Sequence, residues 1–521
     1  MAGILDFDAT QLDAIIEKYG IEDAWIGLLA TNIKNSQKFK YILDSDEFRN
    51  AAFFSADLLK DLSIGEVGVL YEYSVTKVNS DSRKSNGQFF TPDDVAIFMA
   101  GYSKKFPSGK WLDPCSGIGN LSWHLVAIQD NPEQFLIENL VLSDRDKLAL
   151  LIARTLLTTS FQVKENELFH KISENFIEFD FLSVSSNEKL LTFDSGNSLE
   201  KIPKHDFVIV NPPYLATEMD TRFETSKSRD LYAYFMENII KTSRGFISVT
   251  PQSFTNAGKF GDLRRLMLRN YSKVIIFNFD NVPANIFRGI KFGSKNSNTA
   301  NSIRAAITIA QPGKGKWQIT SLLRWRSHER NDLFRLAPKH LSSIDFTDEF
   351  FPKVSKKFEG IYSEACDFPR LGERISKTAT EFSLFVPSSP RYFISALKSP
   401  VKRASQHEIF FSTARDRELA YLLMNSSFMY WWWRVRDGGM TLSQETIFSL
   451  PVPSFTVKKS LIVDLEKSEK TSKVYKQNAG AAQENVKHSM ELVHRLNMLV
   501  FPKYASLLIY AHQNSDIRTE Q

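Results

Sequence analysis

Four consecutive residues, Asn211, Pro212, Pro213 and Tyr214, have the types and the order to do chemistry. They directly follow an apolar run, 206–210, that is typical of a buried β-strand. The two prolines fix φ and remove two backbone donors, so the amide oxygen of Asn211 and the carbonyl of Pro212 remain as acceptors. Two converging acceptors match the two N–H donors of an exocyclic amine, and Tyr214 offers a flat face for a base. These four residues are candidate catalytic residues, and the alternative is a Pro-Pro turn that closes a strand.

A second motif lies upstream, where Asp113, Pro114, Cys115, Gly117 and Gly119 follow a short apolar run. The two glycines let the backbone turn tightly and approach a ligand closely. The spacing differs from the dinucleotide fingerprint, and no lysine follows as it does in a P-loop. A glycine loop without phosphate machinery suits a nucleoside that carries an amino acid. The alternative is a tight strand–helix turn of some other α/β protein.

A third segment, residues 87–92, reads Gly-Gln-Phe-Phe-Thr-Pro and precedes both motifs. In this order the three segments resemble the S-adenosylmethionine-dependent N6-adenine DNA methyltransferases of restriction–modification systems, in the gamma-type group whose cofactor half precedes its catalytic half. The resemblance covers roughly 85–315, with a looser likeness further along. It implies S-adenosylmethionine as the cofactor and double-stranded DNA as the substrate, with a cognate restriction endonuclease or a specificity subunit as a further partner.

The resemblance also implies a role for each matched cofactor residue. Asp113 is expected at the cationic methionine end, and Asp144, after the next strand, at the ribose hydroxyls. Asp180 would accept from the adenine amine of the cofactor, and Phe181 would stack on its ring. A helix cap for Asp144 and a core position for Phe181 are the alternatives. The expected cofactor residues are Phe89, Phe90, Thr91, Asp113, Pro114, Cys115, Gly117, Gly119, Asp144, Asp180, Phe181 and Asn211.

The resemblance further implies that the target adenine is flipped out of the duplex, because a stacked base cannot reach such a pocket. Tyr214 is then expected to stack on the base, so that its ring matters more than its hydroxyl. Family members carry a second aromatic residue at the position where this chain has Ile309. Phe287 or Phe292 in the preceding loop is a possible substitute.

Short apolar runs alternate with longer helical stretches after residue 86. This alternation predicts an α/β, doubly wound and mostly parallel Rossmann-like methyltransferase sheet, with ligands at the carboxyl ends of its strands. The seven expected strands lie at 111–112, 140–142, 176–179, 207–210, 246–249, 274–277 and 305–309.

We expect four regions along the 521 residues. They are an N-terminal helical segment (1–85), the methyltransferase domain (86–315), an α+β target-recognition domain (316–456) and a C-terminal helical tail (457–521). A basic run interleaved with tryptophan follows the methyltransferase region and suits phosphate contacts. The candidate DNA contacts are Lys314, Lys316, Arg324, Arg326, Arg434 and Arg436. The triplet Trp431–Trp433 is expected to be mostly core.

Composition narrows the class of protein only moderately. The net charge of +5 permits nucleic-acid binding without demonstrating it. With only two cysteines, a disulfide framework and a cysteine-rich zinc site are disfavoured, and no metal site is expected. The sequence lacks an 18-residue apolar run and a signal-peptide pattern, so we expect a cytoplasmic protein of a bacterial or phage-infected cell.

Several alternatives stay open at this point. RNA and a protein glutamine also offer a planar amine to these residues, and cytosine N4 is a further target, although such enzymes more often carry serine in place of Asn211. In another class of function, the chain acts only as a methyltransferase subunit of a larger multi-subunit assembly.

Overall fold

The computed structural model describes residues 4–5, 9–78, 91–163, 166–185, 198–287, 291–292, 303–347, 349–390, 392–403, 405–437, 439, 441–478, 481–513 and 515–517. The chain divides into two compact units. Unit 1 comprises Met1–Gln318 and Ser327–Arg335, and unit 2 comprises Ile319–Arg326 and Leu336–Gln521.

A central sheet forms the framework of unit 1. Its strand order is β10-β7-β9-β6-β5-β2-β3-β4, and neighbours from β4 to β6 pair in parallel. β9 runs antiparallel between β6 and β7, so the sheet is mostly parallel. The strands are β2 (Trp111–Asp113), β3 (Leu140–Asp144), β4 (Phe176–Glu178), β5 (Phe207–Val210), β6 (Gly245–Pro251), β7 (Lys273–Phe279), β9 (Ala305–Gln311) and β10 (Trp317–Leu323).

All seven expected strands are present, but the described sheet has eight strands and not seven. The additional strand is β10, with which the chain leaves unit 1 at Gln318. Its sequence mixes polar and apolar residues, as edge strands do, and lacks the continuous apolar run that marks the buried strands. The sequence pattern therefore predicted the interior strands and the edge strand β4, and missed the other edge strand, β10.

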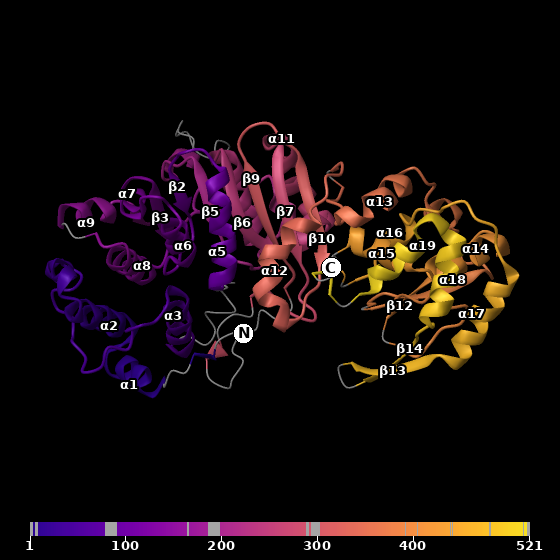
Figure 1. The fold of residues 1–521 in the computed structure, drawn as a ribbon, viewed down its shortest axis with the longest axis horizontal. Helices are drawn as coiled ribbons and strands as arrows, with labels where there is room; N and C mark the ends of the chain where they lie inside the picture. The colour runs from indigo at the N-terminus through magenta and orange to yellow at the C-terminus, as the bar shows by residue number, and fades with distance from the viewer. Residues whose placement is uncertain are drawn as a thin grey trace. The chain divides into compact units, whose positions relative to one another are not determined.

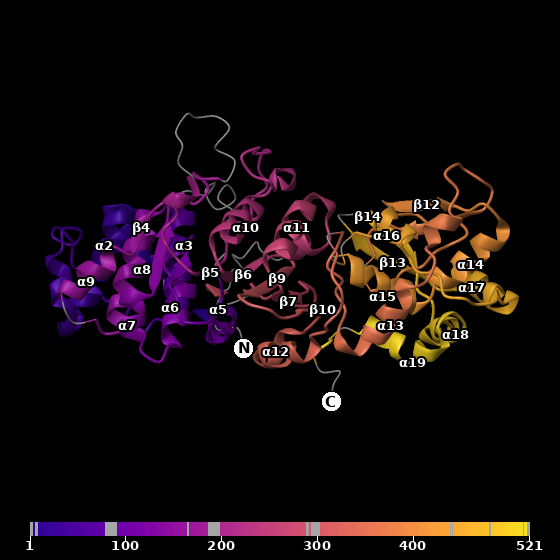
Figure 2. The ribbon, with the colours of Figure 1, turned by 90° about the horizontal axis from the view of Figure 1, so that it is seen from above.

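Helices cover both faces of the sheet, which makes the fold doubly wound. α10 and α11 lie on one side, and α5 and α12 lie on the other (Figure 2). The helices of the sheet region are α5 (Asp93–Gly101), α6 (Asn120–Ala127), α7 (Pro132–Glu138), α8 (Lys147–Ser160), α9 (Asn166–Ser173), α10 (Leu231–Thr242), α11 (Gly261–Asn270) and α12 (Arg330–Leu336).

Three helices precede the sheet, namely α1 (Ala9–Tyr19), α2 (Ile21–Asn35) and α3 (Ile64–Val78), and Figure 1 shows them together in indigo. Apolar residues at helical spacing predicted this segment. It has no hydrophobic core to itself, because Trp25 and Leu28 share a buried cluster with Ile152 of α8 and Phe169 of α9. A short parallel bridge also joins β1 (Ile4–Leu5) to β8 (Lys291–Phe292).

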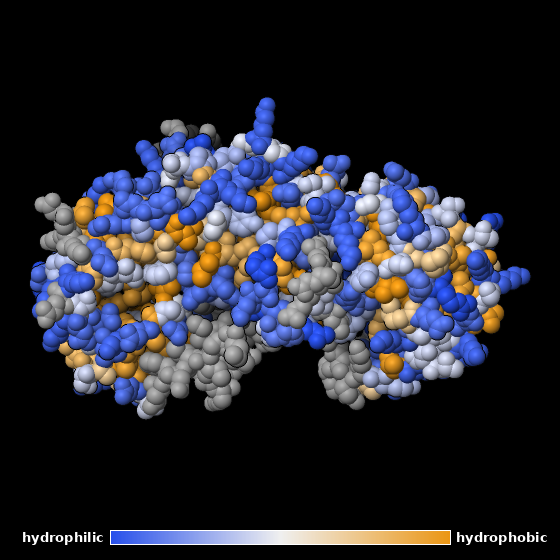
Figure 3. Space-filling model, viewed as in Figure 1, coloured by the Kyte–Doolittle hydropathy of each residue, from blue (hydrophilic) through white to orange (hydrophobic). Residues whose placement is uncertain are grey.

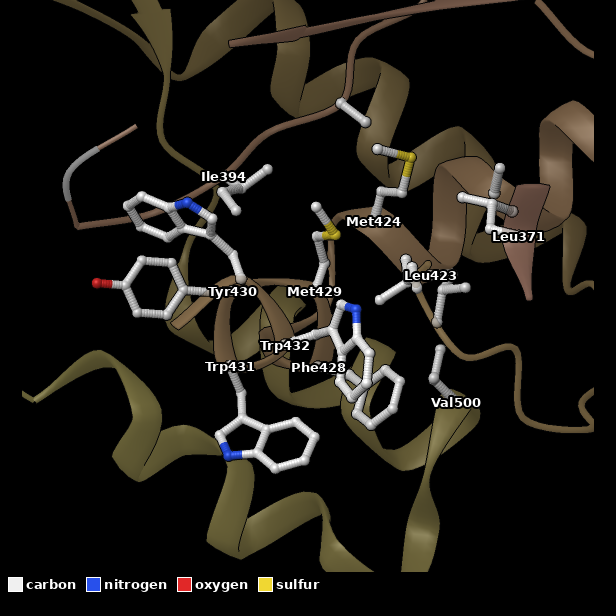
Figure 4. Packing of buried hydrophobic residues seen from close by; sticks show 14 of the residues in the cluster. Leu371, Ile394, Leu423, Met424, Phe428, Met429, Tyr430, Trp431, Trp432 and Val500 are labelled. Carbon is white, nitrogen blue, oxygen red and sulfur yellow. The ribbon is translucent and has the colours of Figure 1, made fainter. Parts of the chain in front are cut away.

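Unit 2 is built around α15, which carries the tryptophan triplet (Figure 4). Trp431, Trp432 and Trp433 are at most 5% exposed, so all three belong to the core, as expected for most of them. The elements of the unit are α13 (Glu359–Cys366), β11 (Ser383–Pro387), β12 (Gln406–Phe410), α14 (Ala414–Met424), α15 (Ser427–Arg436), α16 (Gln444–Phe448), α17 (Lys459–Thr471), β13 (Lys473–Asn478), β14 (Ala481–Val486), α18 (Met490–Val500) and α19 (Ala505–Leu508).

The expectation of continuous helix after residue 457 is corrected by an antiparallel hairpin, β13 and β14. Val474 and Tyr475 favour a strand, and the Asn-Ala-Gly sequence that follows favours a turn, so local preference opposes a helix there. On the visible face, hydrophilic and hydrophobic residues are interspersed (Figure 3). Among the described residues, no helix has both the length and the apolar character to cross a membrane.

Candidate active site

The sequence motifs meet at the carboxyl-terminal ends of three neighbouring interior strands. β5, β2 and β3 are neighbours in parallel, and the residues of interest follow the carboxyl end of each strand. There they surround a cavity of ≈ 230 Å³. The predicted residues that line it are Thr91, Asp113, Pro114, Cys115, Gly117, Asp144, Asp180, Phe181, Asn211 and Pro213. Gly119, Pro212 and Tyr214 lie next to these residues in the chain and do not line the cavity, while Phe89 and Phe90 lie outside the described residues.

The glycine loop uses both of its glycines in the left-handed region. Gly117 has φ of 52° and Gly119 has φ of 84°, values that other residues adopt at a cost. A Cβ on Gly119 would lie 3.2 Å from the Cβ of Ala153 in α8. Gly119 therefore serves packing against α8 and is not among the residues that line the cavity, whereas Gly117 is.

Asp144 is held by the backbone around it. Its Oδ2 accepts from the Gly117 N–H at 2.8 Å, and its Oδ1 accepts from the Asp146 N–H at 2.9 Å. Burial raises the pKa of Asp144, and these two backbone bonds oppose the rise. Because each carboxylate oxygen has more than one acceptor site, the fixed carboxylate can still receive hydroxyl donors from the cavity.

Asp113 is 1% exposed and is only half satisfied. Its Oδ2 accepts from the Ser122 hydroxyl at 2.9 Å. Its Oδ1 is buried and has no hydrogen-bond partner among the described residues. Burial raises the pKa of Asp113 to about 7, although the Ser122 bond favours the charged form. A buried carboxylate oxygen of this kind fits a cationic donor that the protein itself does not supply.

The third strand brings Asp180 and Phe181 to the same cavity. Asp180 is exposed, and its Oδ1 accepts from the Leu182 N–H at 3.0 Å. Phe181 is 1% exposed and stacks on Phe235 of α10 at 5.3 Å between ring centroids. Phe181 is thus a core residue that also lines the cavity, so a core position and a role in stacking on a ligand are compatible.

The charge of the cavity lining is strongly one-sided. Five acidic residues face one basic residue, Arg145, among the described residues. The acidic residues are Glu72, Asp113, Asp144, Asp146 and Asp180. Such a lining attracts a cation and repels phosphate groups. In the described part of the chain, no group of three or more histidine, cysteine, aspartate or glutamate side chains is placed to hold a metal ion.

The Asn211 side chain is oriented by neighbours on both sides. Its Nδ2 donates to the Thr91 hydroxyl at 2.9 Å, and its Oδ1 accepts from the Tyr214 hydroxyl at 2.6 Å. The Tyr214 hydroxyl also lies 2.8 Å from the Val249 carbonyl. The Cys115 thiol donates to the Asn211 carbonyl at 3.3 Å. Asn211 therefore joins the turn 211–214, the glycine loop and the Thr91 segment.

Two further aromatic rings surround Tyr214. Tyr232 and Phe287 meet it edge-on, with centroids 6.3 Å and 6.0 Å away. Ile309 is wholly buried in β9, so it offers no surface for a base. Phe287 is itself only 2% exposed, so it offers no open face for a base either, and the side chain of Phe292 lies outside the described residues.

The expected DNA contacts divide by exposure. Lys314, Lys316 and Arg326 are exposed. Arg324 is 3% exposed and donates to the Gln513 carbonyl and the Tyr430 hydroxyl, which corrects its expected role as a surface phosphate contact. The sequence alone does not distinguish the buried Arg324 from the exposed Arg326, because the contacts that bury Arg324 come from residues far along the chain.

Arg434 and Arg436 are engaged within unit 2. Arg434 donates to the Leu322 carbonyl at 2.7 Å. Arg436 pairs with Glu349 at 2.6 Å and lies over the Phe350 ring. Guanidinium groups held by protein acceptors have less freedom to neutralise phosphates. Arg434 and Arg436 are therefore weaker candidates for DNA contacts than the exposed Lys314 and Lys316.

One wall of the cavity was not predicted from the sequence. Five residues of α3 line it, and none of them belongs to a recognised motif. They are Gly68, Tyr71, Glu72, Val75 and Thr76. Their spacing places them on one helix face, but such a stripe does not distinguish a ligand wall from ordinary packing.

Comparison with known proteins finds restriction–modification methyltransferases. Residues 138–287 match the family described as Eco57I restriction-modification methylase, and this segment contains the Asn211 motif. The type II methyltransferase M.BsuBI of Bacillus subtilis is 25% identical over 203 residues, which are 36% of this chain and 38% of that protein. The type II methyltransferase M.PstI of Providencia stuartii is 23% identical over 241 residues, 41% of this chain and 42% of that protein. The chain thus spans less than half the length of these relatives.

Among solved structures, that of the DrdV–DNA complex has a TM-score of 0.44 at 15% identity, covering 86% of this chain and 48% of the other. That of the type IIG restriction endonuclease BpuSI has a TM-score of 0.41 at 10% identity, covering 98% and 74%. With the family match and the curated relatives, the resemblance to restriction–modification methyltransferases that the motifs predicted is confirmed.

Proposed function

We propose that this protein transfers a methyl group from S-adenosylmethionine to the N6 amino group of adenine in double-stranded DNA, as the modification enzyme of a restriction–modification system. The observation that carries the proposal is the Asn211 turn at the end of β5, beside an acidic cavity, within a segment that matches the restriction-modification methylase family. The exposed lysines Lys314 and Lys316, with Arg326, are the proposed phosphate contacts.

The cavity residues fit S-adenosylmethionine by their charge and by the polar and apolar groups that they offer. The buried Oδ1 of Asp113 would receive the methionine ammonium, and Asp144 would receive the ribose hydroxyls. Phe181 supplies an apolar face for the adenine ring. The excess of carboxylates favours a cofactor that is cationic at both sulfur and amine, and disfavours a dinucleotide with its phosphates.

The chain contributes acceptors where positive charge develops during the reaction. When bound, S-adenosylmethionine supplies an electrophilic methyl group. The amino nitrogen of adenine is a weak nucleophile, because its lone pair is delocalised into the ring. Asn211 Oδ1 and the Pro212 carbonyl can accept its N–H donors as the nitrogen becomes tetrahedral. Since these bonds strengthen in the transition state, they accelerate the methyl transfer. As the N–C bond forms, the bond from the methyl carbon to sulfur breaks and leaves its electron pair on sulfur, and the amine then loses one proton to solvent.

Orientation of Asn211 is the second contribution of the chain. Thr91 holds Nδ2, so the amide cannot turn its donor toward the substrate amine. A base must leave the duplex to reach these acceptors, and the Tyr214 ring is the proposed stacking surface for it. Asn211 in place of serine favours adenine over cytosine as the target base, by resemblance to the family.

The test separates binding from chemistry. We expect Asn211→Ala to lower methyl transfer to DNA by about 100-fold or more, the scale seen when a transition-state hydrogen bond is removed. Cofactor affinity, measured by calorimetry, should fall far less than the rate of methyl transfer, because Asp113 and Asp144 remain although Asn211 also lines the cavity. Methylation at the wild-type rate by Asn211→Ala would contradict the assignment.

A further inference from the structure

Helix α3 precedes every motif on which the proposed function rests, and yet it closes one side of the cavity. Gly68, Tyr71, Glu72, Val75 and Thr76 face the same space as Asp113 and Phe181. Figure 1 shows α3 in indigo, beside the helices of the sheet region. The matched family segment begins only at residue 138, so this wall comes from outside it.

A single side chain ties α3 to the cofactor residues. The Tyr71 hydroxyl donates to Asp146 Oδ2 at 2.7 Å. The other oxygen of Asp146 caps α8 by accepting from the N–H groups of Leu148 and Ala149. The N–H of Asp146 in turn donates to Asp144 Oδ1. Tyr71 is therefore two hydrogen bonds away from the carboxylate expected at the ribose.

Packing and hydrogen bonding hold the Tyr71 side chain in place. It is 8% exposed, and its ring meets Trp25 of α2 edge-on at 5.3 Å. Burial, reinforced by the charge of Asp146, raises the pKa of Tyr71, so the hydroxyl keeps its proton and remains a donor. The hydrogen bond is charge-assisted and partly shielded from water, which makes it one of the stronger kind.

Glu72, the next residue, brings a carboxylate of α3 to the cavity. S-adenosylmethionine carries a sulfonium charge that its demethylated product lacks. A carboxylate in a partly enclosed site therefore attracts the substrate form of the cofactor more than the product form. Release of the product after each turnover is favoured by the same difference.

We propose that α3 is a functional wall of the cofactor site, in which Tyr71 holds the helix on Asp146 and Glu72 favours S-adenosylmethionine over its demethylated product. The inference rests on the proposed function for the identity of the ligand. It gives α3 a role in the N-terminal segment: the helix retains the cofactor and distinguishes its charged sulfonium form from the demethylated product.

The first test uses a matched pair of tyrosines on α3. Tyr71→Phe removes the bond to Asp146, while Tyr73→Phe removes an equivalent bond to Asp13 on α1, away from the cavity. We expect Tyr71→Phe to speed dissociation of S-adenosylmethionine by about tenfold, the effect of one lost charge-assisted hydrogen bond. Tyr73→Phe should leave that rate unchanged. Equal rates in the two variants would overturn the inference, and thermal melting of both controls for folding.

The second test compares Glu72→Gln with Glu66→Gln, a residue of α3 that does not line the cavity. Calorimetry with S-adenosylmethionine and with S-adenosylhomocysteine should show that Glu72→Gln weakens the first and spares the second. Equal weakening of both ligands, or of neither, would overturn the role of Glu72.

Methylation of DNA by the wild type separates the two proposals. If the wild type binds S-adenosylmethionine and the tyrosine pair differs as expected, the inference stands even where no methyl group reaches DNA, and only the proposed function fails. If the wild type methylates DNA and the pair does not differ, only the inference fails. Absence of any cofactor binding overturns both.

Discussion

At the scale of single residues, the proposed function depends on how a few polar side chains are oriented. Asn211 is fixed between Thr91 and Tyr214, and Asp113 has one buried oxygen without a hydrogen-bond partner among the described residues. Sequence identified these residues by type and order. It did not reveal that the Tyr214 hydroxyl contacts Asn211, because a local motif does not specify how a side chain turns. This contact suggests a role for the hydroxyl in addition to the role expected of the ring.

Substitution of Tyr214 tests this point. Tyr214→Phe keeps the stacking face and loses the bond to Asn211 Oδ1, so we expect kcat to fall by about tenfold. Tyr214→Ala also loses the ring, and base stacking is worth enough to lower activity by roughly another tenfold or more. Steady-state kinetics on duplex DNA measures both. A Tyr214→Phe variant as active as the wild type would show that the hydroxyl does not orient Asn211.

The titration of Asp113 predicts how cofactor affinity depends on pH. Its pKa is raised to about 7 in the ligand-free protein, so below that pH the carboxyl is increasingly neutral. A cationic cofactor prefers the charged form, and affinity should therefore fall as the pH is lowered from about 8 to about 6. Burial raises the pKa of Asp144 as well, which acts in the same direction.

Calorimetry in buffers of different ionisation enthalpy measures the proton released on binding. Asp113→Asn should bind weakly and with much less pH dependence. An affinity of the wild type that is constant over this pH range would contradict the assignment of Asp113 to the cofactor amine.

At the scale of elements, the glycine loop illustrates what positions the site. Both Gly117 and Gly119 adopt positive φ, so alanine at either position costs about 1 kcal/mol of folding free energy. A Cβ at Gly119 would also press on Ala153 and Leu142, whereas a Cβ at Gly117 would meet nothing within 4 Å.

We therefore expect Gly119→Ala to lower the unfolding free energy more than Gly117→Ala does, in denaturant melts without cofactor. Gly117→Ala should instead show its main effect on cofactor affinity, since Gly117 lines the cavity. The reverse order of stabilities would mean that the loop is not packed on α8 as described.

The elements that sequence predicted best are those with local signals. The buried strands are continuous apolar runs, and the N-terminal helices carry apolar residues at helical spacing. β10 and the β13–β14 hairpin carry mixed patterns and were missed. The α3 wall could not be predicted, because residues 68–76 reach Asp146 only through the tertiary fold. Likewise, Arg324 and Arg326 look alike in sequence and differ completely in burial.

At the scale of the whole molecule, the exposed basic side chains bear on the proposed binding of DNA. Lys314 and Lys316 are exposed in the turn between β9 and β10. If both contact phosphates, Lys314→Ala with Lys316→Ala should weaken DNA binding at every sequence and lower the slope of affinity against salt by about 2. Lys38→Ala, an exposed lysine of the N-terminal segment, serves as the control. An unchanged salt slope in the double variant would remove these lysines from the proposed interface.

The central claim is that the Asn211 site methylates the amino group of adenine in DNA. The most direct measurement incubates the protein with duplex DNA and S-adenosylmethionine labelled in its methyl group, digests the DNA and separates the nucleosides by mass spectrometry. The account predicts labelled N6-methyladenine in the wild-type reaction and its loss in Asn211→Ala. Label in cytosine, in RNA or in protein, with none in adenine of DNA, would contradict it.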